Sequence, residues 1–266
     1  MSFSKTLDLT GRNILITGGA GFLGRQVAEA LIERGASIVI LDRPGRSLID
    51  CVRSFGAKYK ENFSFIECDL ESECSRNSAL EKIREDRLRL DSLINNAAFC
   101  GSEKLSGWAS TIENQSLETW RRALEVNITA PFHFCRELAP TLAESSNGSI
   151  VNIASIYGEV GPDWGLYQGL DMGNPAAYAV SKGGLIQLTR WLATTLAPSV
   201  RVNAVSPGGL YRGQSEVFVE RYCRKTPLNR MGVESDIVGA IFFLVSEMSV
   251  YCTGQVYTVD GGFTCW

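Results

Sequence analysis

Short apolar runs rich in β-branched residues alternate with helix-like segments along this chain, and no other feature restricts its fold so strongly. Seven runs have the length and composition of buried strands: residues 13–17, 37–41, 63–67, 92–94, 149–153, 200–205 and 255–259. Segments between them carry apolar residues three and four positions apart, as in 24–34, 72–87, 117–143, 175–196 and 235–246. Because alternating strands and helices form β-α-β crossovers, we predict an α/β fold with a doubly wound, seven-stranded parallel sheet, a Rossmann fold.

Length and composition indicate one domain and exclude several kinds of function. The 266 residues are 45% apolar, and no Pro- or Ser-rich linker interrupts them, so we expect a single domain over residues 1–266. A net charge of −3 without blocks of like charge argues against nucleic-acid binding. The longest apolar run, Ile237 to Val245, is far shorter than the roughly 20 residues of a membrane span, and no signal peptide is evident. We expect a cytoplasmic protein that binds neither nucleic acid nor membrane.

The cysteines and the single histidine argue against metal and histidine chemistry. None of the eight cysteines forms a C-x-x-C pair, so we expect no metal site and mostly buried, reduced thiols. The only histidine, His133, lies in an apolar helix-like stretch and is expected to be a packed helical residue. An acid or base must therefore be another residue type.

The first expected strand runs directly into a glycine-rich turn, Thr17 to Gly24, which a helix follows. Glycines permit a tight turn and let the backbone approach a pyrophosphate, whose charge the helix N-terminus stabilises. A simple strand-to-helix connection would show the same glycines. The residues expected to contact a cofactor here are Gly18, Gly21, Phe22, Leu23 and Gly24.

Asp42 lies at the end of the second expected strand, 18 residues beyond Gly24. A carboxylate there accepts hydrogen bonds from both hydroxyls of an adenosine ribose and repels a 2′-phosphate. The alternative is a helix-capping or turn aspartate. Arg43 follows, and its guanidinium can contact a 2′-phosphate or stack on adenine. The sequence therefore favours NAD(H), with NADP(H) as the alternative.

Tyr178 and Lys182 are four positions apart in an expected helix, so both side chains project from one face. An ammonium near a phenol favours the phenolate, and lowering a tyrosine pKa of ~10 by ~3 units requires about 4 kcal/mol. By itself the spacing is also that of an ordinary amphipathic pair.

Further motifs follow the expected strands in order. They are Asp69-Leu70 after the third, Asn95-Asn96-Ala97-Ala98 after the fourth, Asn127 in the next helix, Ser155 after the fifth, Pro207-Gly208 after the sixth and Val259-Asp260-Gly261-Gly262 after the seventh. With the glycine turn and the Tyr-x-x-x-Lys pair, they make the chain resemble the short-chain dehydrogenase/reductase family over almost its whole length. The resemblance implies an NAD(P)-dependent oxidoreductase that interconverts a secondary alcohol and a ketone.

The resemblance also implies a role for each matching residue. Tyr178 would exchange a proton with the substrate oxygen, Ser155 would hydrogen-bond that oxygen, and Lys182 would lower the tyrosine pKa and hold the nicotinamide ribose. Asn127 would anchor a water that connects the lysine to solvent. Besides Tyr178 and Lys182, the cofactor would contact Asp69, Leu70, Asn96, Ala97, Pro207, Gly208 and Leu210. Family members commonly assemble as homotetramers or homodimers, and we expect a homotetramer.

Four features depart from the family pattern. Phe22 stands where compact members usually carry a glycine, and Ala98 replaces the last glycine of the Asn-Asn-Ala-Gly turn. Arg212 stands where a threonine often follows the Pro-Gly turn, so we expect a cation facing the pyrophosphate or an anionic substrate. Ser155 and Tyr178 are 23 positions apart, which is more than is usual.

The additional residues form an insertion over about 156–174, between two candidate catalytic residues, and are expected to cover the substrate. They include Tyr157, Asp163, Trp164, Tyr167, Gln168 and Asp171. Aromatic faces, carboxylates and an amide suit a polyhydroxylated ring, although a surface or oligomer-contact loop is the alternative. The local pattern is similar to that of bacterial reductases of surface-sugar and flagellin-glycan pathways, which favours a small carbohydrate-like substrate.

Two other functions remain open on the sequence. A reductase of 3-oxoacyl thioesters or other lipophilic ketones would use the same catalytic residues, but with a shorter and more apolar loop. A catalytically silent, cofactor-binding regulatory protein would keep the fold without turnover. The intact set of Asn127, Ser155, Tyr178 and Lys182 favours an enzyme.

Overall fold

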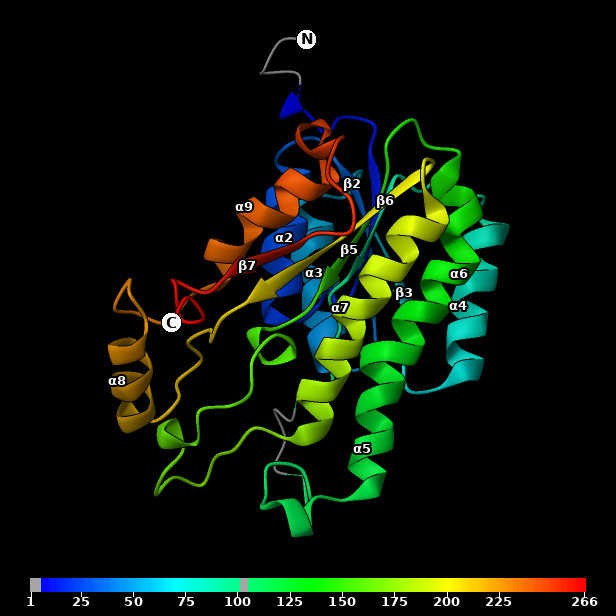
Figure 1. Cartoon of the computed structure of the whole chain (residues 1–266). Helices are drawn as coiled ribbons and strands as arrows, with labels where there is room; N and C mark the ends of the chain where they lie inside the picture. The colour runs from blue at the N-terminus through cyan, green and yellow to red at the C-terminus, as the bar shows by residue number, and fades with distance from the viewer. Residues whose placement is uncertain (1–5, 101–104) are drawn as a thin grey trace.

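A computed structural model describes residues 6–100 and 105–266 of the chain. One parallel sheet in the order β3-β2-β1-β4-β5-β6-β7 runs through it (Figure 1). The strands are β1 (Asn13–Thr17), β2 (Ser37–Asp42), β3 (Phe63–Glu67), β4 (Ser92–Asn95), β5 (Gly148–Ile153), β6 (Val200–Pro207) and β7 (Val256–Val259). Each expected strand overlaps an observed one, so the predicted doubly wound Rossmann fold is confirmed.

Helices cover both faces of the sheet (Figure 1). On one face, buried side chains of three helices form an apolar cluster with the strands: α2 (Phe22–Ile32), α3 (Arg46–Lys58) and α9 (Glu234–Val245). On the other face, the helices that share a second cluster are α4 (Glu73–Glu85), α6 (Ala130–Ala143) and α7 (Ala176–Leu196). Burial of these two faces removes apolar surface from water and is the main driving force for this architecture.

Most of the remaining elements lie around the end of the sheet toward which the strands point. They are α5 (Leu117–Leu124), which packs on α7, α8 (Glu216–Lys225), and the short helical turns η1 (Ile112–Asn114), η3 (Ile156–Gly158) and η4 (Trp164–Leu166). The turn η5 (Glu247–Ser249) lies at the opposite end, where Ser249 Oγ accepts from the Arg201 guanidinium near the start of β6 over 2.8 Å. Figure 1 shows α8 away from the sheet, beside the loop that carries η4.

The helices differ from the sequence expectation in two respects. The expected helix over 117–143 is divided into α5 and α6 by a π-helical segment, η2 (Glu125–Thr129). Helix α8 lies outside the segments expected to be helical, and only Phe218 and Tyr222 of its ten residues are buried.

A chain of buried polar side chains fixes α7 against the middle of the sheet. The Asn95 side-chain amide donates to Asn152 Oδ1 over 2.8 Å, and Asn152 Nδ2 donates to Thr189 Oγ1 over 2.9 Å. Thr189 in turn donates to the Leu185 carbonyl over 2.8 Å. The four residues lie in β4, β5 and α7 and are almost entirely buried. Because buried polar groups need matching partners, this chain specifies how α7 docks.

We expect Asn152→Ala to lower the free energy of unfolding by about 1–3 kcal/mol, because it leaves Asn95 and Thr189 without their buried partner. Urea unfolding followed by circular dichroism measures the change. Asn77→Ala, at an exposed position of α4, is the matched control and should change the free energy by less than about 0.5 kcal/mol. Equal effects of the two substitutions would contradict a stabilising role for the network.

Candidate active site

The candidate site residues gather at the carboxyl ends of the strands. The glycine turn follows β1, Asp42 ends β2, Asn96 and Ala97 follow β4, and Pro207 ends β6. All strands are parallel, so these ends meet along one edge of the sheet. Ligands of doubly wound sheets bind at this edge.

The glycine turn is packed so closely that side chains would not fit. Gly18 has a positive φ of 63°, and a Cβ on it would lie 2.7 Å from the Cα of Ala97. A Cβ on Gly24 would collide with the Gly18 carbonyl oxygen. The Asn96 side-chain amide holds the turn by donating to the carbonyls of Thr17 (3.0 Å) and Gly18 (2.9 Å). Asn96, expected beside the adenosine ribose, therefore also shapes the turn.

Asp42 is bound to the same turn. Its Oδ2 accepts from the backbone N–H of Ala20 over 2.8 Å, and its Oδ1 accepts from that of Arg43 over 2.8 Å. Burial raises the pKa of Asp42, while these two hydrogen bonds oppose the increase. The carboxylate thus has the turn-stabilising role that the sequence left as an alternative. Each carboxylate oxygen has a further lone pair, so the ribose-binding role is compatible with this geometry.

The loop after β3 is held by a buried arginine that the sequence analysis did not single out. Arg76 of α4 is 2% exposed, and its guanidinium donates to the carbonyl of Leu70 and to His133 Nδ1 (3.2 Å). It also forms an ion pair with Glu125 over 2.6 Å. His133 is a buried residue of α6, as expected, and burial followed by the Arg76 charge lowers its pKa. The neighbouring Asp69 is exposed.

Asn127 lies in the π-helical segment and connects two candidate site loops. Its Oδ1 accepts from the backbone N–H of Phe99 over 2.7 Å, and its Nδ2 donates to Ser181 Oγ over 2.9 Å. Ser181 Oγ donates to the backbone carbonyl of Tyr178 over 2.8 Å. Single π-helical turns occur frequently at functional sites, because they re-aim a side chain within a helix. Here the turn aims Asn127 at the loop after β4 and at α7.

Ser155, Tyr178 and Lys182 come together from β5 and α7. Lys182 is 2% exposed, its Nζ donates to the Ile153 carbonyl over 2.7 Å, and it lies 5.8 Å from the centroid of the Tyr178 ring. Ser155 lies close enough to Tyr178 to act toward a lower pKa of the phenol, and its Oγ accepts from the backbone N–H of Tyr157 over 3.2 Å. Tyr178 is half-buried on the first turn of α7. The expected juxtaposition of the three residues is therefore present.

Burial dominates the electrostatics of this group. It raises the pKa of Tyr178 to about 12, although the Ser155 hydrogen bond and the Arg212 charge act in the opposite direction. Burial also lowers the pKa of Lys182 to about 8. The depressed tyrosine pKa expected from the sequence is thus not produced by the groups of this chain. Near neutral pH the phenol carries its proton, which suits a proton donor to a carbonyl oxygen.

The buried lysine should make stability depend on pH. Folding lowers the pKa of Lys182 from 10.5 to about 8, so between these values the unfolded chain holds a proton that the folded chain has released. Stability therefore rises with pH in this window. Compared with Lys182→Met, the wild type should gain up to about 1.4 kcal/mol per pH unit above about pH 8. Urea unfolding of both proteins across the window measures this, and a constant difference in free energy would contradict it.

The insertion between Ser155 and Tyr178 is docked on α8. Asp163 forms an ion pair with Lys225, and the Arg221 guanidinium donates to the carbonyl of Gln168 over 2.7 Å. The Tyr167 ring contacts that of Phe218 at 5.5 Å between centroids. The segment is thus a packed wall of the site rather than an isolated surface loop.

Two tyrosines and an asparagine of this insertion form a polar group beside the candidate catalytic residues. The hydroxyls of Tyr157 and Tyr167 are hydrogen-bonded over 2.7 Å, and the side chain of Asn174 acts to lower the pKa of both phenols. Asn174 is 6% exposed, and its Oδ1 is buried without a partner. The charge of Tyr167 influences the pKa of Tyr178, which places the group within electrostatic range of the catalytic phenol. The two tyrosines were expected at the substrate from the sequence. Asn174 was not, because it lies at the end of the insertion and belongs to no recognisable motif.

The remaining predicted cofactor residues differ in exposure. Phe22 is 71% exposed on the first turn of α2, whereas Leu23 is buried in the core. The Gly208 N–H donates to the Val259 carbonyl over 2.9 Å, and Leu210 forms an isolated β-bridge with Gly232. The turn after β6 is therefore tied to β7 and to the loop before α9.

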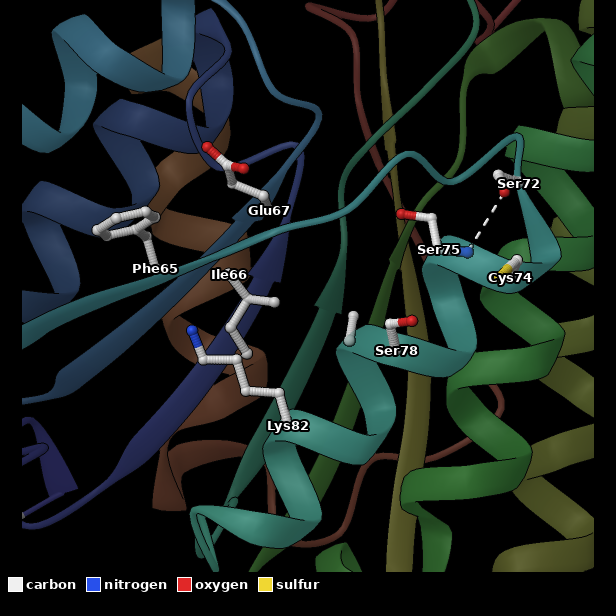
Figure 2. Close-up of a pocket in the computed structure, with 9 residues that line it drawn as sticks. Phe65, Ile66, Glu67, Ser72, Cys74, Ser75, Ser78 and Lys82 are labelled. Atoms are coloured by element: carbon white, nitrogen blue, oxygen red, sulfur yellow. Dashed lines mark hydrogen bonds between the residues drawn. The ribbon is translucent and has the colours of Figure 1, made fainter.

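A separate hollow of about 620 Å³ lies between β3 and α4 (Figure 2). Its lining includes Phe65, Glu67, Ser75, Ser78 and Lys82. None of the candidate site residues lines it. Within the described ranges, no cluster of three or more His, Cys, Asp or Glu side chains could hold a metal ion, and no helix is long and apolar enough to cross a membrane.

Comparisons with known proteins match nearly the whole chain. A family model described as enoyl-(acyl carrier protein) reductase matches residues 19–264. The 3-oxoacyl-(acyl-carrier-protein) reductase FabG of Aquifex aeolicus is 32% identical over 261 residues, which cover 96% of this chain and 98% of that protein. A protein of Rhizobium meliloti described as "Probable galactose dehydrogenase GalD" is 31% identical over 270 residues, with 97% of each covered.

Solved structures agree with this match. A short-chain dehydrogenase of Leptospira borgpetersenii with bound NAD+ has a TM-score of 0.85 and 32% identity, and covers 99% of this chain and 97% of that one. The NADP complex of RhlG from Pseudomonas aeruginosa has a TM-score of 0.83 and 27% identity, and covers 97% and 98%. Both kinds of nicotinamide dinucleotide therefore occur among the structural relatives.

Proposed function

Because the chain belongs to the short-chain dehydrogenase/reductase family, we propose that it is an NAD(H)-preferring enzyme that interconverts a secondary alcohol and a ketone on a polar, carbohydrate-like molecule. As a family member it is an NAD(P)-dependent oxidoreductase acting on CH–OH groups. The observation that carries the finer proposal is the polar group of Tyr157, Tyr167 and Asn174 beside Tyr178.

The glycine turn fits a dinucleotide. A Cβ on Gly18 or Gly24 would meet backbone, so the turn presents bare main chain at the N-terminus of α2. The N-cap residue, Gly21, makes no side-chain capping bond, which leaves N–H groups of the first turn for a pyrophosphate. Asp42 at the end of β2 favours a ribose with a free 2′-hydroxyl, hence NAD(H), with NADP(H) as the alternative.

We assign the proton chemistry to the group on α7 and β5. A bound nicotinamide dinucleotide supplies or accepts the hydride. In reduction, Tyr178 donates its proton to the carbonyl oxygen while Ser155 hydrogen-bonds the same oxygen, and both stabilise the developing alkoxide. Lys182 lies beside the phenol, and Asn127, which connects α7 to the loop after β4, would anchor a water that links the lysine to solvent.

The polar group of the insertion favours a hydroxylated substrate. One of the two tyrosine hydroxyls donates to the other, so one phenolic hydrogen and the buried Asn174 Oδ1 are left without a partner in this group. A substrate hydroxyl both donates and accepts, so it satisfies both groups at once. An acyl chain satisfies neither group. A 3-oxoacyl thioester reductase is therefore our second candidate function, although FabG is a relative.

A coupled assay tests the proposed activity. We expect NADH oxidation with keto-sugars or sugar phosphates, weaker oxidation with 3-oxoacyl thioesters, and a smaller rate with NADPH. Tyr178→Phe should lower kcat by about 10²-fold or more while NADH binding is retained, because only the proton donor is removed. If no ketone is reduced and Tyr178→Phe keeps its cellular function while an Asp42 variant loses it, the protein is a silent cofactor-binding regulator.

The polar group predicts its own kinetic signature. Tyr157→Phe and Asn174→Ala should raise KM for a polyhydroxylated ketone by about tenfold, since each removes about one hydrogen bond, and should leave KM for a small apolar ketone unchanged. Tyr251→Phe, at a fully exposed tyrosine, is the matched control. Better turnover of acyl substrates by Tyr157→Phe, without loss on sugars, would favour the thioester reductase.

We also propose a cytoplasmic homotetramer, with a homodimer as the alternative. Val180 and Trp191 on α7 are 51% and 53% exposed, and Val250 before β7 is 62% exposed. Apolar side chains exposed on long helices and near the edge strand are suited to contacts between copies.

A further inference from the structure

Two departures from the family pattern meet in space. Phe22 begins α2 at the glycine turn, and Arg212 lies in the loop between β6 and α8. The Arg212 guanidinium lies 5.0 Å from the centroid of the Phe22 ring, a cation–π contact. The contact bridges two loops that follow different strands, at the edge of the sheet where a dinucleotide binds.

The surroundings of Arg212 hold it loosely. Its Nε forms an ion pair with Glu234 over 3.1 Å, and its backbone N–H donates to Gln214 Oε1 over 2.7 Å. The arginine side chain is 39% exposed, and Phe22 is 71% exposed. The exposed cation–π contact contributes little. Glu234 is only 13% exposed, but among the described residues it is contacted by Arg212 through Nε alone, so the other guanidinium nitrogens can turn to a stronger partner.

A phosphate group is such a partner. The first turn of α2 carries no acidic side chain and its N-cap has no capping bond, so the helix end beside Phe22 is positive. The Arg212 charge also lowers the pKa of Tyr178, so its field reaches the catalytic phenol. A guanidinium between the helix end and the phenol is suited to bidentate hydrogen bonds with phosphate oxygens.

We propose that Phe22 and Arg212 form a latch that closes over the phosphates of the bound dinucleotide and slows its release. The guanidinium leaves Glu234 for a phosphate while it remains stacked on Phe22, and so joins the β1–α2 turn to the β6–α8 loop across the ligand. The proposal rests on the proposed function in one respect, that the chain binds a nicotinamide dinucleotide. Release of the product cofactor is then the step that the latch controls.

Stopped-flow fluorescence of NADH measures release directly, without turnover. Arg212→Gln should raise the dissociation rate about tenfold, and Phe22→Leu, which keeps an apolar side chain but removes the π face, about threefold. The double variant should release NADH no faster than Arg212→Gln, because both substitutions break one contact. Arg224→Gln, at an exposed arginine of α8, is the matched control. Adenosine, which lacks phosphates, should bind all variants equally.

The outcomes separate the two proposals. Unchanged NADH release from Arg212→Gln, or effects of the two single substitutions that multiply in the double variant, would overturn the latch and leave the oxidoreductase intact. Failure of the wild type to bind either NADH or NADPH would overturn both. Circular dichroism of each variant identifies a loss caused by misfolding, and Arg212→Lys, which keeps the charge without the planar fork, should release NADH at an intermediate rate.

Discussion

The burial of one ammonium group organises the centre of this molecule. Lys182 is almost completely buried, and its Nζ donates a hydrogen bond to the carbonyl of Ile153 at the end of β5. Burying a cation is costly unless it is hydrogen-bonded, so α7 must dock where the Ile153 carbonyl is in reach of the ammonium group. The hydrogen-bonded chain of Asn95, Asn152 and Thr189, which joins β4 and β5 to α7, also fixes this docking.

The same burial connects stability to function. A lysine whose pKa is lowered to about 8 is readily influenced by a neighbouring charge, which is useful beside a proton donor and unfavourable for folding. Asn127 and Ser181 support the first turn of α7 from another direction, through the π-helical segment. Arg76 ties that segment to the loop after β3 through Glu125 and Leu70. Polar contacts therefore link the loop after β3, the π-helical segment and the first turn of α7.

The insertion gives the site its individual character. In the proposed function, the glycine turn, Ser155, Tyr178 and Lys182 serve any secondary alcohol or ketone, whereas Tyr157, Tyr167 and Asn174 discriminate between substrates. Phe218 and Arg221 of α8 pack against the insertion that carries these side chains. The proposed specificity therefore also depends on α8, a short helix with two buried residues.

What the sequence by itself determined was the fold and the positions of its motifs. Strands such as Asn13–Thr17 are local apolar runs, and the glycine turn and the Tyr178–Lys182 spacing are also local. They can therefore be recognised from the sequence alone. The tertiary structure decided what depends on distant residues: the raised pKa of Tyr178, the unpartnered oxygen of Asn174, and the contact between Phe22 and Arg212. Burial and pairing arise only when the strands bring far segments together, and no local pattern encodes them.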